Sequence, residues 1–185
     1  MDRTHRRPTR IAAAIALLAA LTTFAGCGKA HLESETKEGQ YTKAGDVVYQ
    51  VQLTRLLNPD QRPDDNLLEG QEAPKPRETY LAVFMIIQNK SDRPYKPPSD
   101  MKVVDTQGNE HEPLDASGSG FGLSFTDAIP PGDGAPPPDS PASGGPDAAS
   151  MVLFKLKEVS ATDNLPLELE IPVPGEQSSR VELDI

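Results

Sequence analysis

Hydrophobic and polar residues alternate in several short segments of the chain, and this pattern predicts a protein built from β-strands. In segment 47–54 the apolar residues fall on every second position, so we expect a half-buried strand that presents one face to the core: Val47, Tyr49, Val51 and Leu53. Segment 80–87 is apolar at all positions, which is typical of a central strand covered on both faces.

Five further segments complete the predicted sheets. Segments 101–106 and 110–114 flank Gly108, which suits the positive φ of a tight turn, so they predict a hairpin. Segments 150–159, 165–171 and 181–185 alternate again, and the first of them places Val152, Phe154 and Leu156 on one face. About seven short strands without a clear amphipathic helix predict an all-β fold, an immunoglobulin-like antiparallel β-sandwich over residues 43–185.

The N-terminal region follows a different pattern. Arginines at positions 3, 6, 7 and 10 precede an apolar run of 14 residues, Ile11–Phe24, which is too short to span a bilayer. Small residues follow at Ala25 and Gly26. This order is typical of a secretory signal peptide, predicted here as residues 1–26 with cleavage between Gly26 and Cys27. The Arg6–Arg7 pair leaves general secretion and twin-arginine export both open.

Cys27 is the only cysteine, and its position directly after Ala25–Gly26 resembles a bacterial lipobox. In proteins with that motif the cysteine thiol takes a diacylglyceryl group. Two acyl chains give stable anchoring without a transmembrane span. We therefore expect a lipid-anchored protein on the extracytoplasmic side of the cell membrane, with residues 27–42 as a polar, flexible tether.

Net charge and cysteine content exclude one class of partner and one source of stability. Removing residues 1–26 takes four basic residues and one acid from a chain of net charge −10, so the mature chain carries −13. Such a surface repels phosphate backbones, and we expect no nucleic-acid partner. With Cys27 acylated no thiol remains for a disulfide, so the sandwich must be stable through packing alone.

The sequence contains candidate residues for three kinds of chemistry, and none of the three gives a defined site. Glu110–His111–Glu112, near Asp105, resembles a metal site, but on a strand the histidine and the two acids point to opposite faces. Thioether ligation of copper would need methionines that suit core filling better: Met85, Met101 and Met151. The turn 118–122 lacks the nucleophile spacing of serine hydrolases. We therefore expect no catalytic residue, no metal site and no cofactor.

The long connection 115–149 is the segment with the strongest claim to function. Phe121 and Phe125 alternate with Leu123 in a small, polar context, and we expect them to pack at the edge of the sandwich. Seven prolines between positions 130 and 146, among them Pro136, Pro137, Pro138 and Pro141, favour an extended polyproline II conformation. A partner-binding loop and a solvated spacer are both consistent with this composition.

Several motifs, in order, resemble one bacterial family. They are the apolar strand 80–89 followed by Lys-Ser-Asp-Arg-Pro at 90–94, the Pro-Ser-Asp hairpin at 98–113, Pro131–Gly132, and the closing strands near 152–154 and 167–169. The family has no assigned function. It has an immunoglobulin-like fold, is related to a small secreted mycobacterial immunogenic protein, and includes many lipoproteins. The resemblance implies a fold but carries no catalytic residues.

These observations predict a lipid-anchored extracytoplasmic binding or accessory module without catalysis, with an envelope protein as the candidate partner. An envelope carrier of a small ligand or metal is the alternative, and an enzyme is third.

Overall fold

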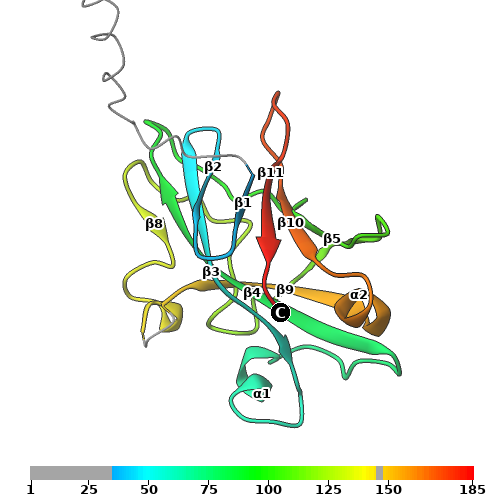
Figure 1. The fold of residues 1–185 in the computed structure, drawn as a ribbon. Coiled ribbons are helices and arrows are strands. Elements are labelled where there is room, and N and C mark those ends of the chain that lie inside the picture. The colour runs from blue at the N-terminus through cyan, green and yellow to red at the C-terminus, as the bar shows by residue number, and fades with distance from the viewer. Residues whose placement is uncertain (1–34, 145–147) are drawn as a thin grey trace, which may run out of the picture. The chain divides into compact units, whose positions relative to one another are not determined.

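The computed structural model describes residues 35–144 and 148–185. The predicted signal peptide, Gly26, Cys27 and the first part of the tether lie outside these residues. The described chain forms two packed β-sheets with few helices, which confirms the predicted all-β sandwich (Figure 1).

Sheet A has six strands. Their order is β2 (Tyr41–Ala44), β3 (Val47–Leu57), β4 (Glu78–Asn89), β9 (Ser150–Lys157) and β7 (Pro113–Leu114), with β8 (Gly134–Ala135) paired to the end of β4. Sheet B has five strands, in the order β1 (Glu35–Lys37), β11 (Ser179–Leu183), β10 (Leu167–Ile171), β5 (Lys102–Val104) and β6 (Glu110–His111). Three short helical segments join them: α1 (Asp64–Leu67), η1 (Pro141–Ser143) and α2 (Glu158–Thr162).

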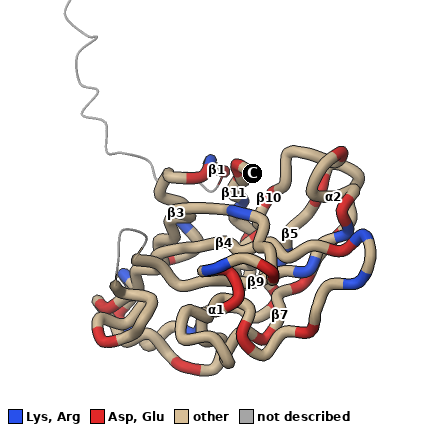
Figure 2. The backbone as a smooth tube through the Cα atoms, turned by 90° about the horizontal axis from the view of Figure 1, so that it is seen from below, with Lys and Arg blue, Asp and Glu red and all other residues tan. Residues whose placement is uncertain are grey.

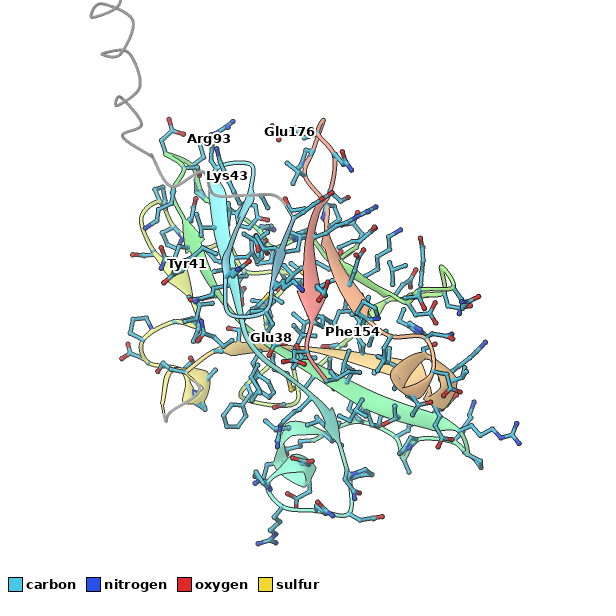
Figure 3. The ribbon with its side chains drawn as sticks, in the orientation of Figure 1. Glu38, Tyr41, Lys43, Arg93, Phe154 and Glu176 are labelled. Carbon is cyan, nitrogen blue, oxygen red and sulfur yellow. The ribbon has the colours of Figure 1, made fainter. Side chains whose placement is uncertain are left out.

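The main core lies between the sheets. It contains the inward side chains of β3, β4 and β9 together with those of β5, β10 and β11. Phe154 of β9, labelled in Figure 3, is fully buried there, as are Val152 and Leu156 on the same face. A second cluster lies on the outer face of sheet A and includes Tyr80, Ala82 and Phe84. β4 is therefore covered on both faces, as its uninterrupted apolar run predicted.

One residue predicted for the inner face lies on the outer face. Leu53 was expected beside Val51, but the register of β3 against β4 shifts between these two residues. Val51 pairs with Met85 in the inner core, whereas Leu53 pairs with Phe84 and packs into the outer cluster. A β-bulge of this kind reverses the alternation of a strand, and the sequence pattern does not reveal it.

The predicted tether is shorter than expected, because its second half is folded. β1 pairs in parallel with β11 in sheet B, and β2 pairs with β3 in sheet A, so residues 35–44 cross from one sheet to the other. Gly39 has a φ of 83° and allows the turn between them. β1 is only three residues long, too short for its alternation to be read from the sequence.

The predicted hairpin is confirmed for β5 and β6, which pair Val103 with His111. The chain then leaves sheet B: β7 pairs with β9 in sheet A, so the segment predicted as one strand, 110–114, serves both sheets. The end of the segment predicted as strand 150–159 is α2 rather than strand.

Candidate functional site

The connection 115–149 is held against the sandwich rather than running free. Leu123 N–H donates to the Met151 carbonyl and Met151 N–H donates to the Phe121 carbonyl, each at 2.8 Å. Further along, Tyr95 and Ile129 exchange two backbone hydrogen bonds of 2.9 and 2.7 Å. The Tyr95 hydroxyl lies 2.6 Å from the hydroxyl of fully buried Tyr49. These bonds fix the path of residues 121–130 along sheet A.

Asn89, at the end of β4, joins this loop to the strand. Its side-chain amide is fully buried and donates to the carbonyls of Arg93, Ile129 and Pro130 at 2.8, 2.9 and 3.1 Å. Its carbonyl oxygen accepts from the N–H and the hydroxyl of Ser91. The Asn-Lys-Ser segment that contributes to the family resemblance therefore has a structural role in this chain.

The proline-rich part folds into turns, so the predicted extended polyproline II conformation is wrong for residues 137–144. Ser140 N–H donates to the Pro137 carbonyl at 3.0 Å, and the Ser143 hydroxyl donates to the Pro138 carbonyl at 2.5 Å. η1 follows at Pro141–Ser143. The serines between the prolines supply these local hydrogen bonds, which a purely compositional reading does not take into account.

A groove of about 830 Å³ lies beside β4 and β8. Its walls come from Ile86 and Gln88 of β4, from Leu123 and Ile129, and from Pro136–Pro138. The lining is mostly apolar, and the exposed acids Asp127 and Asp133 also border it. β8 lies so close to β4 that a Cβ on Gly134 would be 2.5 Å from the Ile87 carbonyl oxygen, so this wall requires glycine.

A smaller pocket of about 280 Å³ lies on the same outer face, next to α1. Leu53, Phe84 and Phe121 line it, and Arg55 stands at its polar side. The Arg55 guanidinium donates to the Asp64 carboxylate at 2.5 Å, and that carboxylate also accepts the Asn58 N–H at 2.9 Å. This pairing holds α1 against β3.

The residues predicted for the partner-binding loop do not share one surface. Phe121 packs into the outer cluster and Phe125 against the inner core, which agrees with the expectation that both pack at the sandwich edge. Pro136–Pro138 line the groove, whereas Phe121 lines the smaller pocket. Pro141 packs against Gly120, because a Cβ atom added at Gly120 would lie 3.0 Å from the Cγ atom of Pro141. The sequence does not identify Ile86 and Gln88 as groove residues, because a continuous apolar strand does not show which part of it the loops leave uncovered.

The candidate metal ligands, Asp105 and residues 110–112, are not among the residues that line the groove. Asp105 is buried and accepts from the side chains of Asn109 and Asn164, both at 2.8 Å. Burial alone would raise the pKa of Asp105, but these hydrogen bonds together hold it well below its usual range. Asp105 therefore orders the β5–β6 turn as an ionised carboxylate.

His111 has a desolvated imidazole. Burial lowers its pKa, while the Asp105 carboxylate acts in the opposite direction. Within the described ranges Nε2 is buried without a hydrogen-bond partner. The part of the chain that the structure describes contains no group of three or more His, Cys, Asp or Glu side chains arranged to hold a metal ion.

The membrane-related predictions rest on residues that the structure does not describe. Gly26 and Cys27 lie there, as does the predicted signal peptide. Within residues 35–144 and 148–185, no helix has the length and apolar character that crossing a bilayer requires.

Comparison with solved structures supports the fold. An uncharacterized β-sandwich protein from Clostridium difficile is 11% identical, with a TM-score of 0.50 over 81% of this chain and 93% of its own. The candidate lipoprotein ycdA from Bacillus subtilis is also 11% identical, with a TM-score of 0.50 over 80% of this chain and 38% of its own. The secreted protein MPT63 from Mycobacterium tuberculosis is 12% identical, with a TM-score of 0.49 over 82% and 96%.

One of the two matches with a TM-score of 0.50 is a candidate lipoprotein, a kind of protein that the resemblance in the sequence named. At such low identity these two matches establish a shared β-sandwich fold and no function. Neither a scan against protein-family models nor a search of curated proteins returned a match.

Proposed function

We propose that this chain is a lipid-anchored envelope protein whose sandwich is a non-catalytic binding module, with the groove beside β4 and β8 as its binding region. The lipid anchor rests on Cys27 and the signal-like segment before it. The observation that carries the binding role is the groove itself, a mostly apolar hollow of about 830 Å³ with acids at its border.

Two properties of the groove favour a protein partner. First, its walls are preformed, because Asn89, Tyr95 and Met151 hold the loop by hydrogen bonds, and a preformed site loses less conformational entropy on binding. Second, Asp127 and Asp133 give its border a negative charge. The complementary partner is a peptide segment of an envelope protein with apolar side chains flanked by Lys or Arg.

The test is cross-linking in cells followed by purification of the intact protein and its variants. Ile86→Lys places a charge in the groove wall, and Val159→Lys places the same charge on α2, where Val159 is 45% exposed. We expect a cross-linked envelope protein with the wild type and with Val159→Lys, but not with Ile86→Lys. Equal cross-linking by both variants would contradict binding in the groove.

The anchor has its own test. Cys27→Ser removes the only thiol that could be acylated, so we expect this variant to leave the membrane fraction. If it fractionates with membranes as the wild type does, the lipid anchor is wrong, whatever the groove binds.

A carrier of a small ligand is the second candidate, and the pocket beside α1 supports it. Its volume of about 280 Å³, its aromatic lining and the cationic Arg55 suit a small apolar molecule with an anionic end. A saturable thermal shift with short-chain carboxylates, reduced in Phe121→Ala, would favour this role. The absence of any shift across such a series would count against it.

A further inference from the structure

One end of the sandwich gathers the start of the described chain and four turns. Glu35 pairs with Arg180 at the beginning of β11, and the Ser179 hydroxyl donates to the Lys43 carbonyl at 2.6 Å. Lys90 N–H donates to the Asp46 carbonyl at 3.2 Å, and Asn89 N–H donates to the Asp133 carbonyl at 2.9 Å. We name this the tether end, formed by Glu35 and segments 43–46, 90–96, 131–133 and 172–180.

The tether end lies opposite α1. In Figure 1 the β10–β11 turn is at the top of the view and α1 at the bottom, and Figure 3 shows Lys43, Arg93 and Glu176 together at the top. β3 runs between the two ends through 11 residues, from Val47 to Leu57. At about 3.3 Å per residue, the strand separates them by about 35 Å.

The length of chain between Cys27 and Glu35 limits how far this end can move from a lipid attached at Cys27. Eight residue steps span at most about 27 Å, and only when fully extended. This reach is shorter than the separation between the tether end and α1. An acylated Cys27 therefore excludes an upright orientation in which the α1 end contacts the bilayer and the tether end points away from it.

The two ends also differ in net charge, and this difference favours the same orientation relative to the bilayer. The tether end carries five cations and five acids: Lys43, Lys90, Arg93, Lys96 and Arg180, with Glu35, Asp46, Asp92, Asp133 and Glu176. The excess of acids over bases in the mature chain must lie elsewhere. Figure 2 looks onto the α1 end, where acidic positions in red follow α1 and the segments around it.

The four cations in the turns are exposed. Three of the five acids are aspartates, whose side chains are shorter than those of lysine and arginine, so at a flat surface the cationic groups make contact first. A Lys or Arg near an anionic leaflet is attracted to it over about one Debye length. The rest of this acidic domain is repelled by the same surface.

We infer that the tether end faces the membrane, with Lys43, Lys90, Arg93 and Lys96 against anionic phospholipid headgroups. This inference rests on the proposed lipid anchor and deepens it. It also places the groove, because Gln88, Pro130 and Asp133 line the groove at this end of β4. Part of the groove then lies near the bilayer, so the partner segment that it fits is one next to a membrane span.

The experiment uses the full lipidated protein in vesicles made of equal parts phosphatidylglycerol and phosphatidylcholine. Because the native cysteine is acylated, a single introduced cysteine is the only thiol that a dye can label. Glu176→Cys reports on the tether end, and Asp60→Cys reports on the α1 end; both positions are exposed. Energy transfer to a headgroup dye should be larger from position 176 than from position 60.

Two charge variants separate headgroup contact from simple tethering. The first replaces Lys43, Lys90, Arg93 and Lys96 with Gln. The matched control replaces Arg62, Lys75, Arg77 and Lys157 with Gln, which changes the net charge equally near the α1 end. We expect the first variant, and high salt, to reduce the difference in transfer between positions 176 and 60, because only the tether then orients the domain, and the control to retain it in full.

Each alternative outcome contradicts one part of the proposal. Equal transfer from the two positions in the wild type, or larger transfer from position 60, contradicts the orientation. A difference of unchanged size in the first variant contradicts the headgroup contact. Mass spectrometry before reconstitution reports the acyl chains, and a protein without them contradicts the proposed anchor itself.

Discussion

The two faces of sheet A are built in different ways. The inner face packs against another sheet, and side chains such as Leu81, Val83 and Met85 are fully buried there. The outer face is covered by α1 and by loop residues 115–123, and half-buried Leu53 and Ile86 remain in its cluster. The groove and the smaller pocket lie on this outer side, both with lining residues from β4.

The two faces should therefore contribute differently to the stability of the fold. Contacts between two sheets follow from the alternation of side chains along strands, and they fill the space between the layers. A cover made of loops depends instead on a few hydrogen bonds between distant residues, such as those of Asn89, and it leaves hollows. In this sandwich the inner face should determine the stability of the fold, while the outer face is available for ligands.

The strongest test of this contrast removes one aliphatic side chain from each face of β4. Leu81→Ala should lower the free energy of unfolding by about 3 kcal/mol, because it leaves a cavity in a fully packed core. Ile86→Ala, on the half-buried groove wall, should cost about 1 kcal/mol. Urea denaturation measures both values. Equal losses would mean that the two faces are packed alike.

Asn89→Ala tests the bonds that hold the loop cover. It leaves the carbonyls of Arg93, Ile129 and Pro130 without their amide donor in a buried site, and we expect a loss of about 2 kcal/mol. Hydrogen exchange should rise first at Ile129, whose N–H bonds to Tyr95. Asn58→Ala, in an exposed turn, is the matched control and should change stability by less than about 0.5 kcal/mol.

Acid should weaken sheet B through the β5–β6 turn. The pKa of Asp105 is lowered in the folded chain, so its contribution to stability is complete above its ordinary pKa, near 3.9, and is lost as the pH falls below that value. Between about pH 5 and pH 3 the wild type should lose more stability than Asp105→Asn. Identical pH profiles for the two proteins would remove Asp105 from this role.

The smallest expected effect concerns His111, at the edge where β6 approaches β9. Its pKa is lowered by burial despite Asp105, so the folded state prefers the neutral ring, and stability falls as the pH drops below about 6.5. Lys157 opposes protonation as well. His111→Gln should lack this decline between about pH 7 and pH 5, measured by urea denaturation. A wild type without the decline would contradict a lowered pKa of His111 in the folded chain.

The sequence predicted those parts of the fold that depend on local alternation. β3, β4, β9, β10 and β11 all lie where an alternating or continuous apolar pattern placed them. The errors share a cause, since each depends on pairing with a distant partner. β1 and β2 were assigned to the tether, the bulge before Leu53 was missed, and β7 leaves its predicted hairpin for β9.

The sequence predicted the position of the candidate site more accurately than its conformation. The connection 115–149 does border the groove, and its prolines form one wall. Its conformation was wrong because Ser140 and Ser143 bond to proline carbonyls, an effect of particular neighbours rather than composition. The hollow beside Ile86 arises where a loop covers a strand incompletely, and this depends on the path of residues far away in the chain.

The short parallel strand β1 has a mechanical consequence. A pull on the chain ahead of Glu35, along the axis of β1, loads the three residue pairs with β11 in shear, so they must fail together rather than one after another. The Glu38 carboxylate, which follows β1, also links the two sheets. It accepts a hydrogen bond from the Thr54 N–H in sheet A and one from the Asp184 N–H, just after β11 of sheet B, each at 3.1 Å. Force entering at this point is therefore shared by both sheets.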